Sequence, residues 1–151
     1  MSFVEVLSRA EPQVLANASD ALGRAHLAHY EAAGPDESQH RLEDLIQLVV
    51  GCVADRNLEP ICRFAESLST RRFEAGFDIA EVQTAFNVVE EAIWQVVIPQ
   101  VPPEELAEAI GLVGTVLGAG KDSLARSWVS LAAKRHVPSL DLTELFRGTS
   151  Y

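Results

Sequence analysis

Three histidines have spacings that could support metal or haem chemistry. His26 and His29 lie three residues apart, so one face of a helix could carry both. The segment ESQH, which ends at His40, has the Glu-x-x-His spacing of carboxylate-bridged metal sites. Such a site needs a second Glu-x-x-His motif and two further glutamates, and the sequence has no second copy of the motif. We therefore interpret His26 and His29 as a half-exposed pair on the first long helix. We predict no metal and no haem, with a ligand role for the three histidines as the alternative.

A glycine-rich segment, GTVLGAGKDS (residues 114–123), has part of the pattern of a phosphate-binding loop. That pattern requires a glycine five residues before Gly120 and a serine or threonine after Lys121. The sequence has Thr115 and Asp122 at these positions, and the Asp122 carboxylate would repel a nucleotide. No strand pattern precedes the segment. Helix packing therefore explains these glycines better than a nucleotide site does.

The cysteines and carboxylates indicate no catalytic group. Cys52 and Cys62 have no accompanying His or Asp arrangement that would support nucleophilic catalysis, and we interpret them as core residues. The chain contains 22 Asp and Glu residues, so carboxylate pairs arise from abundance and none stands out as an acid and base. We predict that the protein is not an enzyme and has no cofactor. The weaker alternative is an enzyme with a metal in the core of a helical bundle.

Composition narrows the class of protein and its surroundings. A chain of 151 residues with 48% hydrophobic residues suits one globular domain with its own core. A net charge of −10 opposes the phosphates of DNA, so we expect no nucleic-acid partner. No apolar run approaches the roughly 18 residues that span a bilayer, so we expect no membrane contact. Two cysteines and an N-terminus without a signal pattern indicate a cytoplasmic protein.

Apolar residues recur at helical spacing along nearly the whole chain, and no segment alternates as a strand does. We predict an all-α fold in which residues 1–136 form a single bundle of five to six helices. The first long helix begins at Pro12 and carries Leu15 through His29 on one stripe, and AAGPD (residues 32–36) ends it. The tail, residues 137–151, leaves the bundle and carries a short amphipathic turn with Leu142, Leu145 and Phe146.

The stretch RRFEAGFDIAEVQTAF (residues 71–86) predicts two helices joined by a glycine turn. Gly76 is placed where a residue after a helix adopts a left-handed conformation. Asp78 can cap the next helix, and Glu81 three residues later completes a capping box. DNA-reading domains use a similar turn, but the exposed face of the second helix is acidic here, so we predict a structural turn.

The same stretch carries a family resemblance. Its residues and those of the following helix resemble the N-terminal domain of the RsbR-type stressosome proteins, the RsbT co-antagonists, over roughly residues 15–133. The matching residues are Arg72, Gly76, Phe77, Asp78, Glu81, Val82, Phe86 and Ile93. The resemblance implies a globin-like fold that lacks haem, a homodimer, and a sensory or protein-binding role in stress signalling with a regulatory protein partner.

The last long helix has an apolar stripe close to a heptad register, and a second stripe of glycines beside it. A glycine inside a helix costs around 1 kcal/mol, so close approach by another helix is the natural reason for them. We predict that this helix lies in or beside a dimer interface. The candidate interface residues are Gly111, Gly114, Leu117, Gly118, Leu124 and Trp128. A contact within one chain is the alternative explanation.

Two classes of function follow. The first is a non-enzymatic signalling domain that dimerises and passes a change through its last helix to a partner. The second is a small-molecule or haem-binding sensor with a pocket between its helices.

Overall fold

The computed structural model describes residues 2–136, which form seven α-helices and two short 3-10 helices and contain no strand. The predicted all-α fold class is confirmed. The α-helices are α1 (Phe3–Arg9), α2 (Glu11–Arg24), α3 (Ala28–Ala33), α4 (Pro35–Asp55), α5 (Glu59–Glu74), α6 (Ile79–Val96) and α7 (Leu106–His136). The 3-10 helices η1 (Ile98–Gln100) and η2 (Pro103–Glu105) connect α6 to α7.

The first long helix is broken, which the sequence did not predict. α2 ends at Arg24, and His26 adopts a left-handed conformation with φ of 52° before α3 begins. Histidine is one of the few residues besides glycine found there with some frequency. The Nδ1 atom of His26 lies 2.8 Å from Oε1 of Glu31, which holds the bend. His26 and His29 therefore do not share a helix face, and the break accounts for the additional helix.

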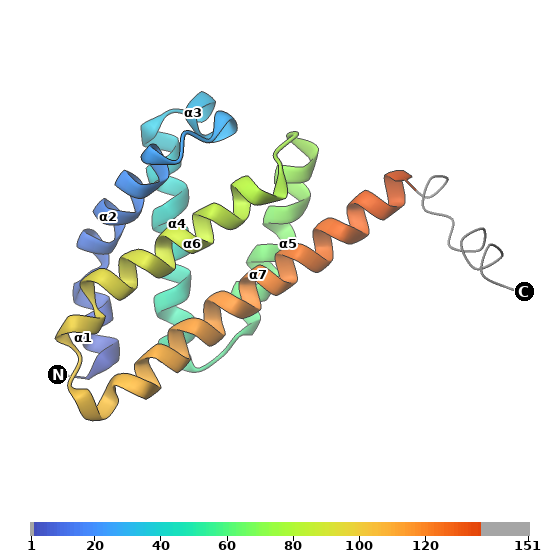
Figure 1. The fold of residues 1–151 in the computed structure, drawn as a ribbon. Helices are drawn as coiled ribbons and strands as arrows, with labels where there is room; N and C mark the ends of the chain where they lie inside the picture. The colour runs from blue at the N-terminus through green and yellow to red at the C-terminus, as the bar shows by residue number, and fades with distance from the viewer. Residues whose placement is uncertain (1, 137–151) are drawn as a thin grey trace, which may run out of the picture.

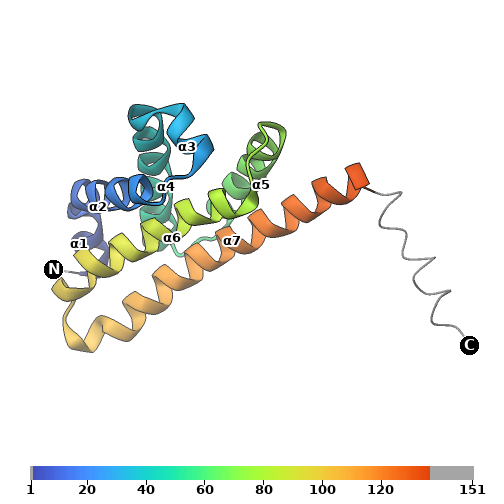
Figure 2. The same cartoon turned by 45° about the horizontal axis from the view of Figure 1, so that its top comes forward.

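The core forms where the long helices cross. α5 packs along α7, and α2 packs against both α6 and α4. Figures 1 and 2 show α6 and α7 side by side with opposite chain directions, while the last turns of α7 extend beyond the other helices. The largest fully buried side chains include Leu7, Val14, Leu42, Ile46, Ile61, Phe86, Ile93, Leu117 and Leu124. Every α-helix except α3 contributes to that set, so the apolar stripes read from the sequence meet in one core.

At Gly120, α7 packs closely against α5 and α6. A Cβ atom at this position would lie 2.9 Å from Cγ1 of Ile61 in α5 and 2.9 Å from Cε1 of Phe86 in α6. Real Cβ atoms do not tolerate such distances, so glycine is required for this packing. Beside it, the Lys121 ammonium donates to Oδ1 of Asn87 at 3.1 Å and joins α7 to α6 at the surface.

Three sequence predictions concern the ends and the surroundings of the bundle. No helix within residues 2–136 is both long enough and apolar enough to cross a bilayer. The amphipathic turn predicted at Leu142, Leu145 and Phe146 lies outside the described residues, so the division into a domain and a tail stays a prediction. The globin-like arrangement also stays a prediction.

Candidate functional site

The turn between α5 and α6 closes as a Schellman motif. Gly76 has a φ of +85°, the left-handed value that the sequence predicted. Its N–H donates to the carbonyl of Phe73 at 3.1 Å, and the N–H of Phe77 donates to the carbonyl of Arg72 at 3.0 Å. These two bonds satisfy carbonyls that a helix end leaves without partners. The turn therefore sets the direction in which α6 departs from α5.

A capping box opens α6 directly after the turn. The Asp78 carboxylate accepts a hydrogen bond from the N–H of Ala80 at 2.8 Å, and Oε1 of Glu81 accepts one from the N–H of Asp78 at 3.1 Å. Both halves of the predicted box are present. Anionic side chains at this end also oppose the positive end of the helix dipole.

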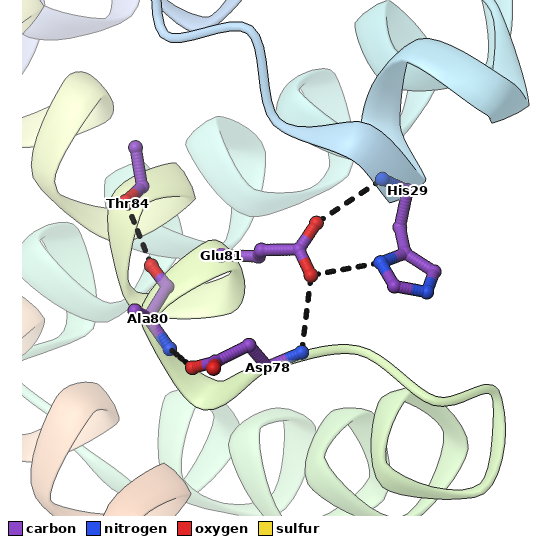
Figure 3. A network of polar contacts seen from close by, with 5 residues as sticks. All are labelled: His29, Asp78, Ala80, Glu81 and Thr84. Carbon is purple, nitrogen blue, oxygen red and sulfur yellow. Dashed lines mark hydrogen bonds and ion pairs between the residues drawn. The ribbon is translucent and has the colours of Figure 1, made fainter.

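The Glu81 carboxylate has a second partner that lies far away in sequence. His29, at the start of α3, donates its backbone N–H to Oε2 of Glu81 at 3.1 Å, and its ring Nδ1 lies 2.8 Å from Oε1. Figure 3 shows the carboxylate between His29 and the N–H of Asp78. One carboxylate thus joins the start of α3 to the start of α6.

Aromatic contacts extend this network towards the interior. The Phe77 ring stacks on the His29 ring with centroids 4.6 Å apart, and meets Tyr30 edge-on at 5.4 Å. The Arg72 guanidinium lies over the same Phe77 ring, with its carbon 5.2 Å from the ring centroid. Phe86 is fully buried and belongs to the core. Among the turn residues identified in the sequence, Asp78 is therefore exposed, Arg72, Phe77 and Glu81 are half-buried, and Phe86 is buried.

The electrostatics of Glu81 follow from its contacts. Burial would raise the pKa of its carboxyl, but the hydrogen bonds from the N–H groups of Asp78 and His29 and from the His29 ring more than offset burial, so the pKa is lowered. The carboxylate is 13% exposed, so water screens these contacts weakly. Glu81 stays ionised and holds both helix starts.

A family model described as the RsbT co-antagonist protein rsbRD N-terminal domain matches residues 12–135. The chain belongs to this family. The match confirms the resemblance that was read from the turn and the helix after it. Searches of the curated proteins and of the solved structures found no match to the chain.

The histidines of this RsbRD N-terminal domain lie apart. His26 faces Glu31, His29 faces Glu81, and His40 lies 3.7 Å from Oδ2 of Asp44. Within residues 2–136, no group of three or more His, Cys, Asp or Glu side chains is placed to hold a metal ion. The predicted pairing of His26 with His29 was wrong because the helix breaks between them.

The candidate interface residues of α7 divide into two sets. Leu117 and Leu124 are fully buried in the core of one chain, and Trp128 is 9% exposed and meets Phe73 edge-on at 5.5 Å. Packing within one chain accounts for these three. In contrast, the candidate glycines Gly111, Gly114 and Gly118 are exposed, and a Cβ atom added to any of the three would meet no atom of residues 2–136 within 4 Å.

Three residues of the turn's surroundings were missed by sequence reasoning. His29 was assigned to a stripe of the first helix rather than to Glu81. Tyr30 and Arg41, which lie near Arg72, carried no motif at all. The residues next to a histidine or an arginine in an amphipathic helix do not indicate which residue of another helix it will contact. A single sequence therefore could not predict these contacts.

We expect Gly76→Ala to destabilise the RsbRD N-terminal domain by about 1 kcal/mol, because alanine is strained at a φ of +85°. Gly23→Ala is the matched control. Gly23 lies within α2, where an added Cβ atom meets nothing within 4 Å, and alanine is the better helix former there. Urea denaturation of both variants measures the difference, and equal midpoints would contradict the assignment of the turn.

We expect the stability of the domain in acid to depend on Glu81. Because its pKa is lower in the folded chain than the value of about 4.3 for an unfolded glutamate, the carboxylate stabilises the fold above that pH. This contribution is lost as the pH falls through the folded-state pKa. Between about pH 5.5 and about pH 3, a window below ordinary histidine titration, wild type should therefore lose more stability than Glu81→Gln.

At neutral pH the same variant should be less stable than wild type by roughly 1 kcal/mol, since an amide oxygen is a weaker acceptor than a carboxylate. Glu91→Gln, an exposed position on the same helix, is the control. Urea midpoints across the pH window measure the effect. Parallel losses in wild type and Glu81→Gln would show that Glu81 does not stabilise the fold as its contacts indicate.

Proposed function

We propose that this domain is a non-enzymatic, homodimeric signalling module in bacterial stress-response regulation. The family description supports a regulatory role, since it names a co-antagonist of RsbT. We propose that the domain works in the cytoplasm and acts on a regulatory protein partner. In this account it carries no catalytic group, and its output is a change of contacts between chains.

The observation that carries the proposal is the exposed face of α7. Three of the four glycines in this 31-residue helix lie on that face, and packing among residues 2–136 requires none of the three. Each costs around 1 kcal/mol relative to alanine, so a helix shaped by its own bundle alone would do better without them. Three small residues on one face would allow the backbone of a second helix to approach closely.

The same face continues along the helix. Gly111, Gly118, Ala125 and Ala132 are spaced by sevens, and Val129, which is 67% exposed, lies five turns after Gly111. A repeat of seven keeps one seam of a helix turned towards a partner helix. Asp122 lies seven residues before Val129, at the same position of the repeat, and forms an ion pair with Arg126. The face therefore offers small and apolar residues together with one carboxylate that pairs with a neighbouring arginine.

A dimer through this face would supply a route for a signal. A domain without catalytic groups changes its output by shifting the populations of alternative contacts. Because α7 packs along α5 inside the chain, a displacement of one element would reach the other. A partner bound to the far end of α7 would sense that displacement.

The alternative is a sensor for a small molecule or haem, and the cavities beside α3 favour its small-molecule form. One of about 390 Å³ lies between α2, α3 and α4, and a smaller one of about 60 Å³ adjoins it across Tyr30 and Leu42. The residues among 2–136 that line them include no histidine or cysteine. The two cavities therefore offer space for a ligand without the usual axial ligands of haem.

Native mass spectrometry combined with an absorption spectrum tests the proposal against this alternative. The signalling dimer predicts a species of twice the 16.4 kDa chain mass without visible absorption. A strong visible band with added haem mass would favour the haem sensor. A monomer that carries a small ligand would favour the small-molecule sensor and contradict the dimer.

A further inference from the structure

The smaller of the two cavities is lined by arginines from α4 and α5. Its volume of about 60 Å³ is room for a few water molecules or for a small organic molecule. Leu42, Leu45, Phe64 and Phe86 form much of its apolar wall. The polar lining consists of Tyr30, Arg41, Asp44, Arg71 and Arg72. Four helices, α3 to α6, therefore enclose a space with apolar walls and an excess of positive charge.

Two of these guanidinium groups have unused donors. The Nε atom of Arg41 donates to Oε1 of Glu37 at 3.1 Å, but its Nη1 atom is buried and has no hydrogen-bond partner in the described part of the chain. Arg72 lies over the Phe77 ring, and its Nε atom is likewise buried without a partner among residues 2–136. Leaving a buried charged donor unpaired is costly, so both atoms call for an acceptor.

The charges around the cavity identify the kind of acceptor. Burial lowers the pKa of Arg72, and the nearby positive charge of Arg41 lowers it further, so the two guanidiniums repel each other. The carboxylate in the lining, Asp44, is 54% exposed and lies beside His40. Burial also raises the pKa of Tyr30, although the charge of Arg72 and the hydrogen bond that Arg72 donates to the Tyr30 hydroxyl oppose this, so the hydroxyl stays neutral and keeps its own proton to donate. Water would satisfy the donors, but an anion would also relieve the repulsion.

We infer that this cavity binds the carboxylate of a small organic acid between Arg41 and Arg72. The planar fork of a guanidinium matches the two oxygens of a carboxylate. The apolar wall suits a short hydrocarbon chain, and the volume limits the ligand to a few carbons. Asp44 at the edge works against a doubly charged anion such as phosphate. This site is independent of the dimer, because its residues come from α3 to α6 and not from α7.

Binding of a ligand in the cavity would also affect the turn between α5 and α6. Arg72 contacts both the cavity and the Phe77 ring, and Phe77 stacks on His29. A carboxylate that fixes the Arg72 guanidinium would therefore order the aromatic cluster and the start of α6. Binding at this place is thus coupled to the segment that characterises the family.

Thermal unfolding and calorimetry of the full chain with sodium propionate test the site. Solutions at neutral pH and constant ionic strength contain propionate, inorganic phosphate or chloride alone. We expect Tm to rise with propionate concentration, as it does for any ligand that binds the folded state, and to rise less with phosphate. The absence of a rise with propionate, or an equal or larger rise with phosphate, would overturn the assignment.

Substitutions of the two arginines test whether propionate binds in this cavity. Arg41→Gln and Arg72→Gln should each weaken propionate binding about tenfold or more, because each removes a charged donor from the carboxylate. Arg63→Gln is the control, since Arg63 is on α5, is 76% exposed and pairs with Glu59. Arg41→Gln keeps the test decisive if Arg72→Gln fails to fold. Unchanged affinity in Arg41→Gln, or equal losses in Arg63→Gln, would place any binding elsewhere and overturn the proposal.

Discussion

Gly114→Leu is expected to convert the dimer to monomer while leaving each chain folded. In the described part of one chain a Cβ atom at Gly114 meets nothing within 4 Å, and leucine is the better helix former by around 1 kcal/mol. Between two chains, the added side chain would separate helices that otherwise approach closely. The dissociation constant of the dimer should rise at least about tenfold, which corresponds to a loss of about 1.4 kcal/mol.

Sedimentation velocity measures this shift, and circular dichroism reports helicity in the same samples. Gly51→Leu is the matched control, because Gly51 is an exposed glycine within α4 where an added Cβ atom also meets nothing within 4 Å. It should leave the dimer intact. If Gly114→Leu instead stays dimeric, or if it unfolds while Gly51→Leu does not, the glycine face of α7 does not join two chains in the proposed way.

Gly120→Leu is expected to produce a large loss of folding stability, although it lies only six residues from Gly114. A Cβ atom here would lie 2.9 Å from Ile61 and from Phe86, and the rest of a leucine side chain has no space. Overpacking of this kind costs about 3 kcal/mol, and the gain in helix propensity returns around 1 kcal/mol. The net loss should be about 2 kcal/mol or more.

The midpoint of urea unfolding, with an unchanged m-value, measures this loss. Gly51→Leu again serves as the control and should be as stable as wild type or more so. A Gly120→Leu variant with wild-type stability would show that α7 does not approach α5 and α6 as closely as the structure indicates.

Features set by neighbours in sequence were predictable. Gly76, Asp78 and Glu81 act within one turn of chain, so their spacing was sufficient to predict the left-handed glycine and the capping box. The helical period likewise predicted the all-α class. These features depend on residues that are close in sequence, and tertiary packing has not changed them here.

Features set by partners on other helices were not predictable. His29 and Glu81 are 52 residues apart, and only the fold brings them together. The break before α3 carries no glycine or proline at the residue that bends, because His26 itself adopts the left-handed conformation. In the sequence Arg41 cannot be distinguished from a surface arginine, and only the packing of α4 against α5 brings it close to Arg72.

Sedimentation equilibrium of the wild-type chain tests the central claim most directly. The account predicts a mass of twice 16.4 kDa at tens of micromolar protein, with dissociation to single chains on dilution. A mass of 16.4 kDa at every concentration up to that range would contradict a signalling role that depends on contacts between two copies of this domain.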